Sequence, residues 1–408
     1  MTNLTTLTIL TILTLSNKLK MSHRIKLGCL FTWCVIMTPL LVASSEPQLS
    51  IGVMDETTLF TRGDASVACY RIPIMLRSSR GTLIVATEGR KNSCGDEGPK
   101  FIAIRRSLDG GATWLPAQFI WNDPSALGAN LGVIFEDEAN HTIFIQFVHG
   151  FKSWDPLKKP NMLGLLTSRD EGRTWSSPRN ISEQLGSFAF VGGPGYGLSK
   201  KYSPNKGRML FCGHSSLSTD GVYCIYSDDH GETWRWGAEM PSIPYGDWKR
   251  HGDFNPDECQ PYEMPNGDIV VNARNQNEYR CACRIELVSK DGGETFSLRD
   301  IRVVEDLPDN QIQSSVLYQD GIVFFTNPYN RTVQNRINMT LSWSTDDGVS
   351  FQYQLPIWGK GSGYSALASI KPMDDMGFGV LGLAFEKGPD KRTYWHSIAF
   401  TRLAYIRR

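Results

Sequence analysis

An eight-residue phrase stands near the middle of this 408-residue chain: Ser227-Asp228-Asp229-His230-Gly231-Glu232-Thr233-Trp234. Its pattern, S-x-D-x-G-x-[TS]-[WF], recurs four more times, around Asp109, Asp170, Asp291 and Asp346. Successive aspartates of the five copies lie 61, 59, 62 and 55 residues apart. A fixed period of about 60 residues is the signature of a repeat architecture, so the phrase predicts repeated copies of one structural unit.

Each copy is typical of a hairpin turn. Ser and Asp side chains accept hydrogen bonds from backbone N–H groups just ahead of them, and Gly supplies a positive φ. Runs typical of strands flank the copies, such as residues 101–104 before the first and 221–226 before the third. Few stretches have helical periodicity. We therefore interpret the five repeated aspartates as structural, and not as acid catalysts or calcium ligands.

The period also predicts how many units the fold contains. From about residue 48 onward, the chain divides into six units, and six four-stranded units closed into a ring make a six-bladed β-propeller. We predict an all-β fold in which residues 46–408 form one propeller domain, with the sixth unit completed by the two chain ends. An open β-solenoid is an alternative, although about 60 residues is long for one rung; a pair of sandwiches needs no such period.

Charge and the N-terminal segment bear on compartment and partners. The chain has 42 basic and 42 acidic residues, so it lacks the basic footprint of a nucleic-acid or membrane-surface protein. Residues 1–45 are expected to be a leader, with a signal peptide starting at Met21: a basic start, an apolar run over 27–43 and small residues before Glu46. The alternative for this run is a membrane anchor, for which it is short.

Seven cysteines follow this leader, and most are expected to be oxidised in a secreted chain. Cys212 and Cys224 flank a predicted hairpin and are the easiest pair to bridge. Cys281 and Cys283, two apart on a predicted strand, would point to one face and could meet Cys259; the alternative there is a metal site, although no further ligand lies at suitable spacing. Four glycosylation sequons agree with a secretory route: Asn140, Asn180, Asn330 and Asn338.

Three arginines lie in or beside short apolar runs: Arg71, Arg274 and Arg336. A buried guanidinium is costly unless it has an anionic partner. Arg71-Ile72-Pro73, the repeated turns and two later arginines together resemble the sialidases, and the closer resemblance is to the animal lysosomal sialidase. The segments that carry it are 253–263, 272–276 and 361–365, and the likeness extends over roughly residues 65–400.

The resemblance implies a set of site residues. Sialic acid carries a carboxylate, which family members hold with three arginines that match Arg71, Arg274 and Arg336; guanidinium groups suit a carboxylate because they offer paired, charge-assisted hydrogen bonds. By family position Glu386 would orient Arg71, and Arg90 would contact the sugar. The resemblance implies no cofactor and no metal.

The same resemblance implies the catalytic residues. Tyr364 matches the family nucleophile, Glu258 the carboxylate that takes its proton, and Asp96 the acid that protonates the leaving oxygen and later activates water. A neutral tyrosine avoids the repulsion that a carboxylate nucleophile would meet from the substrate carboxylate, several kcal/mol at about 4 Å and protein-like dielectric. A phenol with a reference pKa near about 10 needs such a base.

The expected activity is therefore exo-α-sialidase hydrolysis, with net retention, of terminal sialic acids on glycoproteins, oligosaccharides and glycolipids. The alternatives are a non-catalytic glycan-binding or receptor-type propeller, and transfer of sialic acid to another sugar. The resemblance also implies the lysosomal lumen, reached through the secretory pathway, and a complex with protective protein/cathepsin A; secretion, the cell surface and a homo-oligomer stay open. The C-terminus differs from the lysosomal members, because Tyr405 has no bulky apolar residue three places after it.

Overall fold

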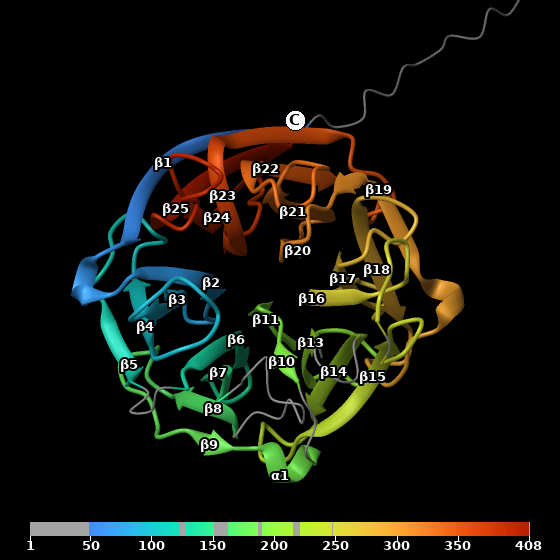
Figure 1. The fold of residues 1–408 in the computed structure, drawn as a ribbon, viewed down its shortest axis with the longest axis horizontal. Coiled ribbons are helices and arrows are strands. Elements are labelled where there is room, and N and C mark those ends of the chain that lie inside the picture. The colour runs from blue at the N-terminus through green and yellow to red at the C-terminus, as the bar shows by residue number, and fades with distance from the viewer. Residues whose placement is uncertain are drawn as a thin grey trace, which may run out of the picture. The chain divides into compact units, whose positions relative to one another are not determined.

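The computed structural model describes residues 49–122, 127–150, 162–186, 190–214, 221–246 and 248–407. The predicted leader lies outside these residues. The fold is an all-β propeller in which the sheets are arranged around a common axis, with strands such as β2, β6 and β16 nearest to it (Figure 1). No helix among the described residues is long and apolar enough to cross a membrane.

In the part of the chain that the structure describes, two of the sheets have four strands each and two have five. The first four-stranded sheet comprises β2 (Cys69–Arg77), β3 (Leu83–Arg90), β4 (Lys100–Ser107) and β5 (Gln118–Asn122). The second comprises β16 (Pro256–Glu263), β17 (Ile269–Asn275), β18 (Cys283–Ser289) and β19 (Arg302–Pro308). One five-stranded sheet comprises β11 (Gly195–Tyr196), β6 (Ala129–Asp137), β7 (Thr142–His149), β8 (Met162–Ser168) and β9 (Arg179–Asn180). The other comprises β10 (Val191–Gly192), β12 (Leu198–Ser199), β13 (Met209–His214), β14 (Gly221–Ser227) and β15 (Arg235–Pro241).

The remaining sheet has seven strands and joins the two ends of the domain. In spatial order it comprises β1 (Leu49–Thr61), β25 (Ser397–Arg407), β24 (Phe378–Lys387), β23 (Tyr353–Lys371), β22 (Ile337–Ser344), β21 (Ile322–Pro328) and β20 (Ser315–Gln319). The long strand β23 pairs with β22 through residues 353–361 and with β24 through residues 362–371. The helical segments of the described residues are short: α1 (Ser182–Leu185) and two 3₁₀ turns, Asp64–Ser66 and Leu298–Asp300.

The five repeated phrases form turns with one shared set of hydrogen bonds. In the copy between β14 and β15, the Ser227 hydroxyl donates to Asp229 and accepts from the Gly231 N–H, each over 2.8 Å. Asp229 also accepts from the backbone and hydroxyl of Thr233. Gly231 is required because its φ is +83° and an added Cβ would lie 2.9 Å from Phe144. The other four copies repeat this set of hydrogen bonds within the turn.

The core lies between adjacent sheets. Each sheet is covered on both faces by its neighbours, so strands such as β3 are buried along their whole length and do not alternate between apolar and polar residues. The closing aromatic residue of the turn phrase packs into this core: Trp234 is 1% exposed and contacts Phe135 and Phe211.

Antiparallel pairing puts the predicted site residues at one end of the strands. Arg71 and Glu258 lie near the starts of β2 and β16, the first strands of their sheets. Arg274 and Glu386 lie near the ends of β17 and β24, which pair antiparallel with β16 and β23. The repeated turns follow the third strands and therefore lie at the opposite end.

Candidate active site

The structure brings all eight predicted catalytic and substrate-binding residues into one network of contacts. Six of them lie on the strands β2, β3, β16, β17, β23 and β24, while Asp96 lies on the loop between β3 and β4 and Arg336 lies just before β22. Five of them are buried almost completely: Arg71, Arg90, Glu258, Tyr364 and Glu386. So many buried charges are tolerable only because they are paired.

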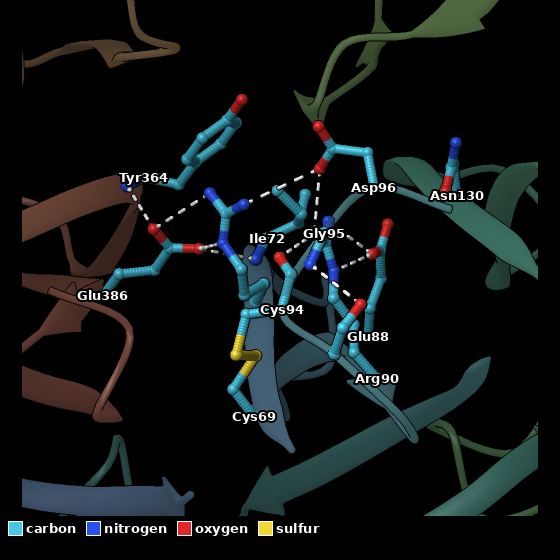
Figure 2. A network of polar contacts seen from close by, with 12 residues as sticks. Cys69, Ile72, Glu88, Arg90, Cys94, Gly95, Asp96, Asn130, Tyr364 and Glu386 are labelled. Carbon is cyan, nitrogen blue, oxygen red and sulfur yellow. Dashed lines mark hydrogen bonds and ion pairs between the residues drawn. A yellow bond between two sulfur atoms is a disulfide. The ribbon is translucent and has the colours of Figure 1, made fainter. Parts of the chain in front are cut away.

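Glu386 holds Arg71 in place. Its carboxylate accepts from Arg71 Nε over 3.0 Å and from Arg71 Nη2 over 3.5 Å, and the glutamate side chain is fully buried. The same carboxylate accepts from the backbone N–H groups of Ile72 and Tyr364 over 3.1 and 3.2 Å. Figure 2 shows both contacts. One carboxylate therefore fixes the first arginine and the strand that carries the tyrosine.

The backbone beside Arg71 has an unusual conformation. Ile72 has a φ of +59°, and the pairing of β2 with β3 shifts register between Arg71 and Ile74. Positive φ is costly for a β-branched residue and persists where its surroundings impose it. Here the Ile72 N–H donates to Glu386 and the side chain packs against Tyr364 and Ile312. The bulge turns the Arg71 side chain and the Ile72 N–H toward Glu386.

Asp96 contacts two arginines at once. Its Oδ1 lies 2.8 Å from Arg90 Nη1 and 3.6 Å from Arg71 Nη1. Figure 2 shows Asp96 beside Arg90. Partial desolvation acts to raise the pKa of the carboxyl group, but the charges of Arg90, then Arg71, outweigh it and lower the pKa of Asp96 to about 2. Its side chain is nevertheless 79% exposed, so the carboxylate is ionised and accessible.

A second cluster surrounds Tyr364. Its hydroxyl contacts Glu258 Oε1, and Glu258 Oε2 accepts from Arg274 Nη1 over 2.8 Å. The Arg71 and Arg336 guanidinium groups lie 5.2 and 5.8 Å from the centre of the tyrosine ring. Burial, and next the charge of Glu258, raise the pKa of Tyr364 well above its usual value, although the three arginines lower it. The tyrosine is therefore a neutral phenol next to a carboxylate that can take its proton.

Arg336 is held by a residue that the sequence interpretation did not select. Its Nη1 donates to the Tyr394 hydroxyl over 2.5 Å, and Nη2 donates to the Gln311 carbonyl over 3.3 Å. The ring of Tyr394 also lies 5.5 Å from the Arg71 guanidinium carbon and 5.2 Å from that of Arg336. Tyr394 thus lies between two of the three arginines.

Sequence reasoning also missed the groups that hold Arg90 and the Asp96 loop. Glu88 is paired with Arg90 Nη2 over 2.8 Å and accepts from the Leu131 N–H of the adjacent sheet over 2.7 Å. Lys100 donates to the Asp96 carbonyl over 2.6 Å, and burial, despite the opposing charge of Glu88, lowers the pKa of this lysine to about 8. The available signal was a charged residue at the edge of an apolar run, because Glu88 follows the run at 83–86 and Lys100 precedes the run at 101–104.

The disulfides confirm one expectation and correct another. Cys212 and Cys224 are bonded as predicted. Cys281 and Cys283 do not meet Cys259: they are bonded to each other, and Cys259 is the free cysteine of the described residues. The reason is that β18 begins at Cys283, so Cys281 precedes the strand and strand alternation does not apply; the bond also occupies the thiols that a metal would need. A further bond, Cys69–Cys94, ties the Asp96 loop to β2.

The four predicted glycosylation residues differ in exposure. Asn140 and Asn180 are exposed, whereas Asn330 and Asn338 are partly buried.

Comparison with known proteins identifies the family. A model described as a BNR repeat-like domain matches residues 81–372. The chain belongs to this family. It is 27% identical over 366 residues to a sialidase of Micromonospora viridifaciens, a match that covers 82% of this chain and 52% of that protein. It is 26% identical over 267 residues to human Sialidase-4, covering 59% of this chain and 52% of that protein.

Solved structures agree with the fold. The Hadza microbial sialidase Hz136 superposes with a TM-score of 0.68 at 24% identity, covering 85% of this chain and 68% of that one. The leech intramolecular trans-sialidase does so with a TM-score of 0.66 at 20% identity, covering 86% and 70%. The chain spans 52% and 59% of the length of the bacterial sialidases from Micromonospora viridifaciens and Bacteroides fragilis.

Proposed function

We propose that the protein is an exo-α-sialidase that hydrolyses terminal sialic acids with net retention. The observation that carries this proposal is the contact between the Tyr364 hydroxyl and Glu258 beside Arg71, Arg274 and Arg336. Three guanidinium groups around one space suit a substrate carboxylate. The Tyr364 phenol and the Glu258 carboxylate suit attack on the anomeric carbon, which bears the substrate carboxylate. The sialidase relatives support the same assignment.

In this mechanism Glu258 takes the Tyr364 proton as the phenol oxygen attacks the anomeric carbon. The high pKa of the buried tyrosine means that the free phenolate is scarce, so proton transfer has to accompany the attack. The bond to the leaving oxygen breaks as Asp96 protonates that oxygen. Water, activated by the Asp96 carboxylate, then releases the sugar from Tyr364.

Asp96 needs a change of environment to serve as this acid, because its pKa of about 2 keeps it ionised in the free site. Arg71 contributes to that low value and is also the arginine that would bind the substrate carboxylate. A bound carboxylate would offset the charge of Arg71 and add repulsion, and both effects raise the pKa of Asp96. Substrate binding would thus raise the pKa of Asp96 and favour the protonated form that can act as the acid.

Replacing Tyr364 by Phe tests the nucleophile. With a fluorogenic sialoside, kcat is expected to fall by about a thousandfold, near 4 kcal/mol in the barrier, because the ring remains but the attacking oxygen is gone. Tyr202→Phe, at an exposed tyrosine, is the matched control and should leave kcat unchanged. Near-normal turnover in the Tyr364 variant would show that Tyr364 is not the nucleophile. Absence of turnover in the unaltered protein, with sialoside still bound, would favour the glycan-binding alternative.

Other parts of the proposal lie further from the site. We infer that the seven-stranded sheet comprises two blades that share β23, which gives the six expected from the period. Residues 46–408 would form the single propeller domain behind a cleaved leader. Glycoproteins, oligosaccharides and glycolipids are the proposed substrates, the lysosomal lumen is the proposed location, and protective protein/cathepsin A is the proposed partner. Immunolocalisation together with a pH profile would test the location.

A further inference from the structure

A histidine and an aspartate are paired at the junction of two sheets, beside the site but outside the mechanism above. His214 is the last residue of β13, and Asp257 is the second residue of β16. His214 Nδ1 lies 2.5 Å from Asp257 Oδ1, and the two side chains are only 11% and 15% exposed. Sequence analysis selected neither residue.

Asp257 also contacts the groups that surround the tyrosine. Its Oδ1 accepts from the Glu258 N–H over 2.9 Å, and its Oδ2 lies 3.9 Å from Arg274 Nε. Arg274 Nη1 lies 2.8 Å from Glu258 Oε2, and its buried Nε makes no hydrogen bond within the described part of the chain. The adjacent carboxylates of Asp257 and Glu258 therefore compete for the Arg274 guanidinium group, and the contact with Glu258 is the shorter one in this structure.

We propose that His214 is a positioning residue of this site: its protonated imidazole neutralises Asp257 and so leaves Arg274 paired with Glu258 and available to substrate. Loss of that proton would leave Asp257 as a second anion with Arg274 as its nearest cation. The guanidinium group would then be drawn toward Asp257 and away from Glu258. Substrate affinity, which needs all three arginines in place, would fall.

The electrostatic surroundings support this role. In the described residues the charged groups that act on the imidazole are Asp257 and Glu258 of β16 and Arg274 of β17. Burial lowers the pKa of His214 and is the largest single influence, but Asp257 and then Glu258 outweigh it, so the pKa of His214 is raised. Burial also acts on Asp257, yet the charge of His214, then Arg274, lowers the pKa of Asp257.

The sign of the pH effect follows. A raised histidine pKa means that the ion pair contributes its full stabilisation at acidic pH, below the usual histidine range, and loses it as the pH rises through the folded-state value. The inference rests on the proposed function and predicts that substrate affinity declines on the alkaline side.

The test uses the full chain with His214→Gln, which keeps a hydrogen-bonding side chain but cannot carry charge. Between about pH 4.5 and 8, KM is expected to be about tenfold higher than in the unaltered protein at the acidic end and to lose its rise toward alkaline pH. His214→Gln combined with Asp257→Asn removes both charges, so it should fold and recover a low KM that varies little with pH. His230→Gln, at an exposed histidine 2.9 Å from Asp137 and within a repeated turn, is the control and should retain the original profile.

Two results would overturn the inference. One is a His214→Gln profile that rises with pH in parallel with the unaltered protein; the other is a failure of the double variant to recover KM. A readout independent of activity separates this from the proposed function. NMR titration of labelled histidines in the unaltered protein should give His214 a pKa above the usual value, and Asp257→Asn should lower it. If the protein does not turn over a sialoside, the proposed function fails while this titration still tests the pair.

Discussion

Glu386 explains several features of the site at the scale of single residues. Its buried carboxylate accepts from Arg71, from the Ile72 N–H and from the Tyr364 N–H. Gly363 precedes the tyrosine because a Cβ there would lie 2.0 Å from Glu386 Oε2. A carboxylate in this position has to be paired on every side to be stable. The first arginine and the nucleophile are therefore set by one group.

Tyr394 is the residue whose role is easiest to isolate. Tyr394→Phe removes the hydroxyl that accepts from Arg336 Nη1 but keeps the ring beside Arg71 and Arg336. Hydrogen bonds to charged groups contribute about 1.5–3 kcal/mol, so KM for a sialoside should rise about tenfold while kcat changes little. Steady-state kinetics measures both constants.

A matched control for this variant is Tyr353→Phe, at a half-exposed tyrosine. Its kinetic constants should equal those of the unaltered protein. If Tyr394→Phe lowered kcat and left KM unchanged, Tyr394 would act in the chemical step and not in holding Arg336.

At the scale of elements, the repeated turns stabilise the fold without taking part in the site. Ser227→Ala removes the hydroxyl that serves both Asp229 and the buried Gly231 N–H. Leaving such a group unpaired costs about 1–3 kcal/mol, so the free energy of unfolding should fall by that amount in chemical denaturation. The kcat of the folded fraction should not change, because the turns lie at the end of the strands opposite to the site.

Ser177→Ala, at an exposed serine, provides the comparison. Its free energy of unfolding should change by less than about 0.5 kcal/mol. Equal effects of the two serine substitutions would mean that the repeated serine has no special structural role.

Elements also show how far the sequence could predict this molecule. The five turns, the strands around them and the residues matched by resemblance were predictable, because each depends on a local pattern that stays close to its position in the chain. Tyr394, His214 and Asp257 were not, because each acquires its role from a partner far away in the sequence: Tyr394 contacts Arg336, and His214 and Asp257 come from different sheets. Cys281 was misinterpreted for a similar reason, since the start of β18 depends on pairing with β17 and β19.

At the scale of the whole domain, closure brings distant residues together. β1 pairs antiparallel with β25 from Leu49–Arg407 to Thr61–Ser397, so the first described strand completes the last sheet. The register places Phe60 opposite Ile398. Arg71 lies on β2, directly after this strand, and its partner Glu386 lies on β24, which pairs with β25. The site and the closure of the ring therefore depend on the same neighbouring strands.

Phe60 tests this dependence. It is 2% exposed, and its ring centre lies 4.9 Å from that of Tyr70, the residue before Arg71. Phe60→Ala should lower the free energy of unfolding by about 3–5 kcal/mol, while Met54→Ala, on an exposed part of the same strand, should change it little.

Hydrogen exchange should show that amides of β1 and β25 lose protection before those of β13 and β14, because opening of the ring would begin at the joined ends. Sialoside turnover should fall with the same denaturant dependence as β25 protection, since Glu386 loses its neighbouring strand. Uniform loss of protection across all sheets would contradict opening between β1 and β25. Turnover that persists after the β25 amides have lost protection would show that the site does not depend on ring closure.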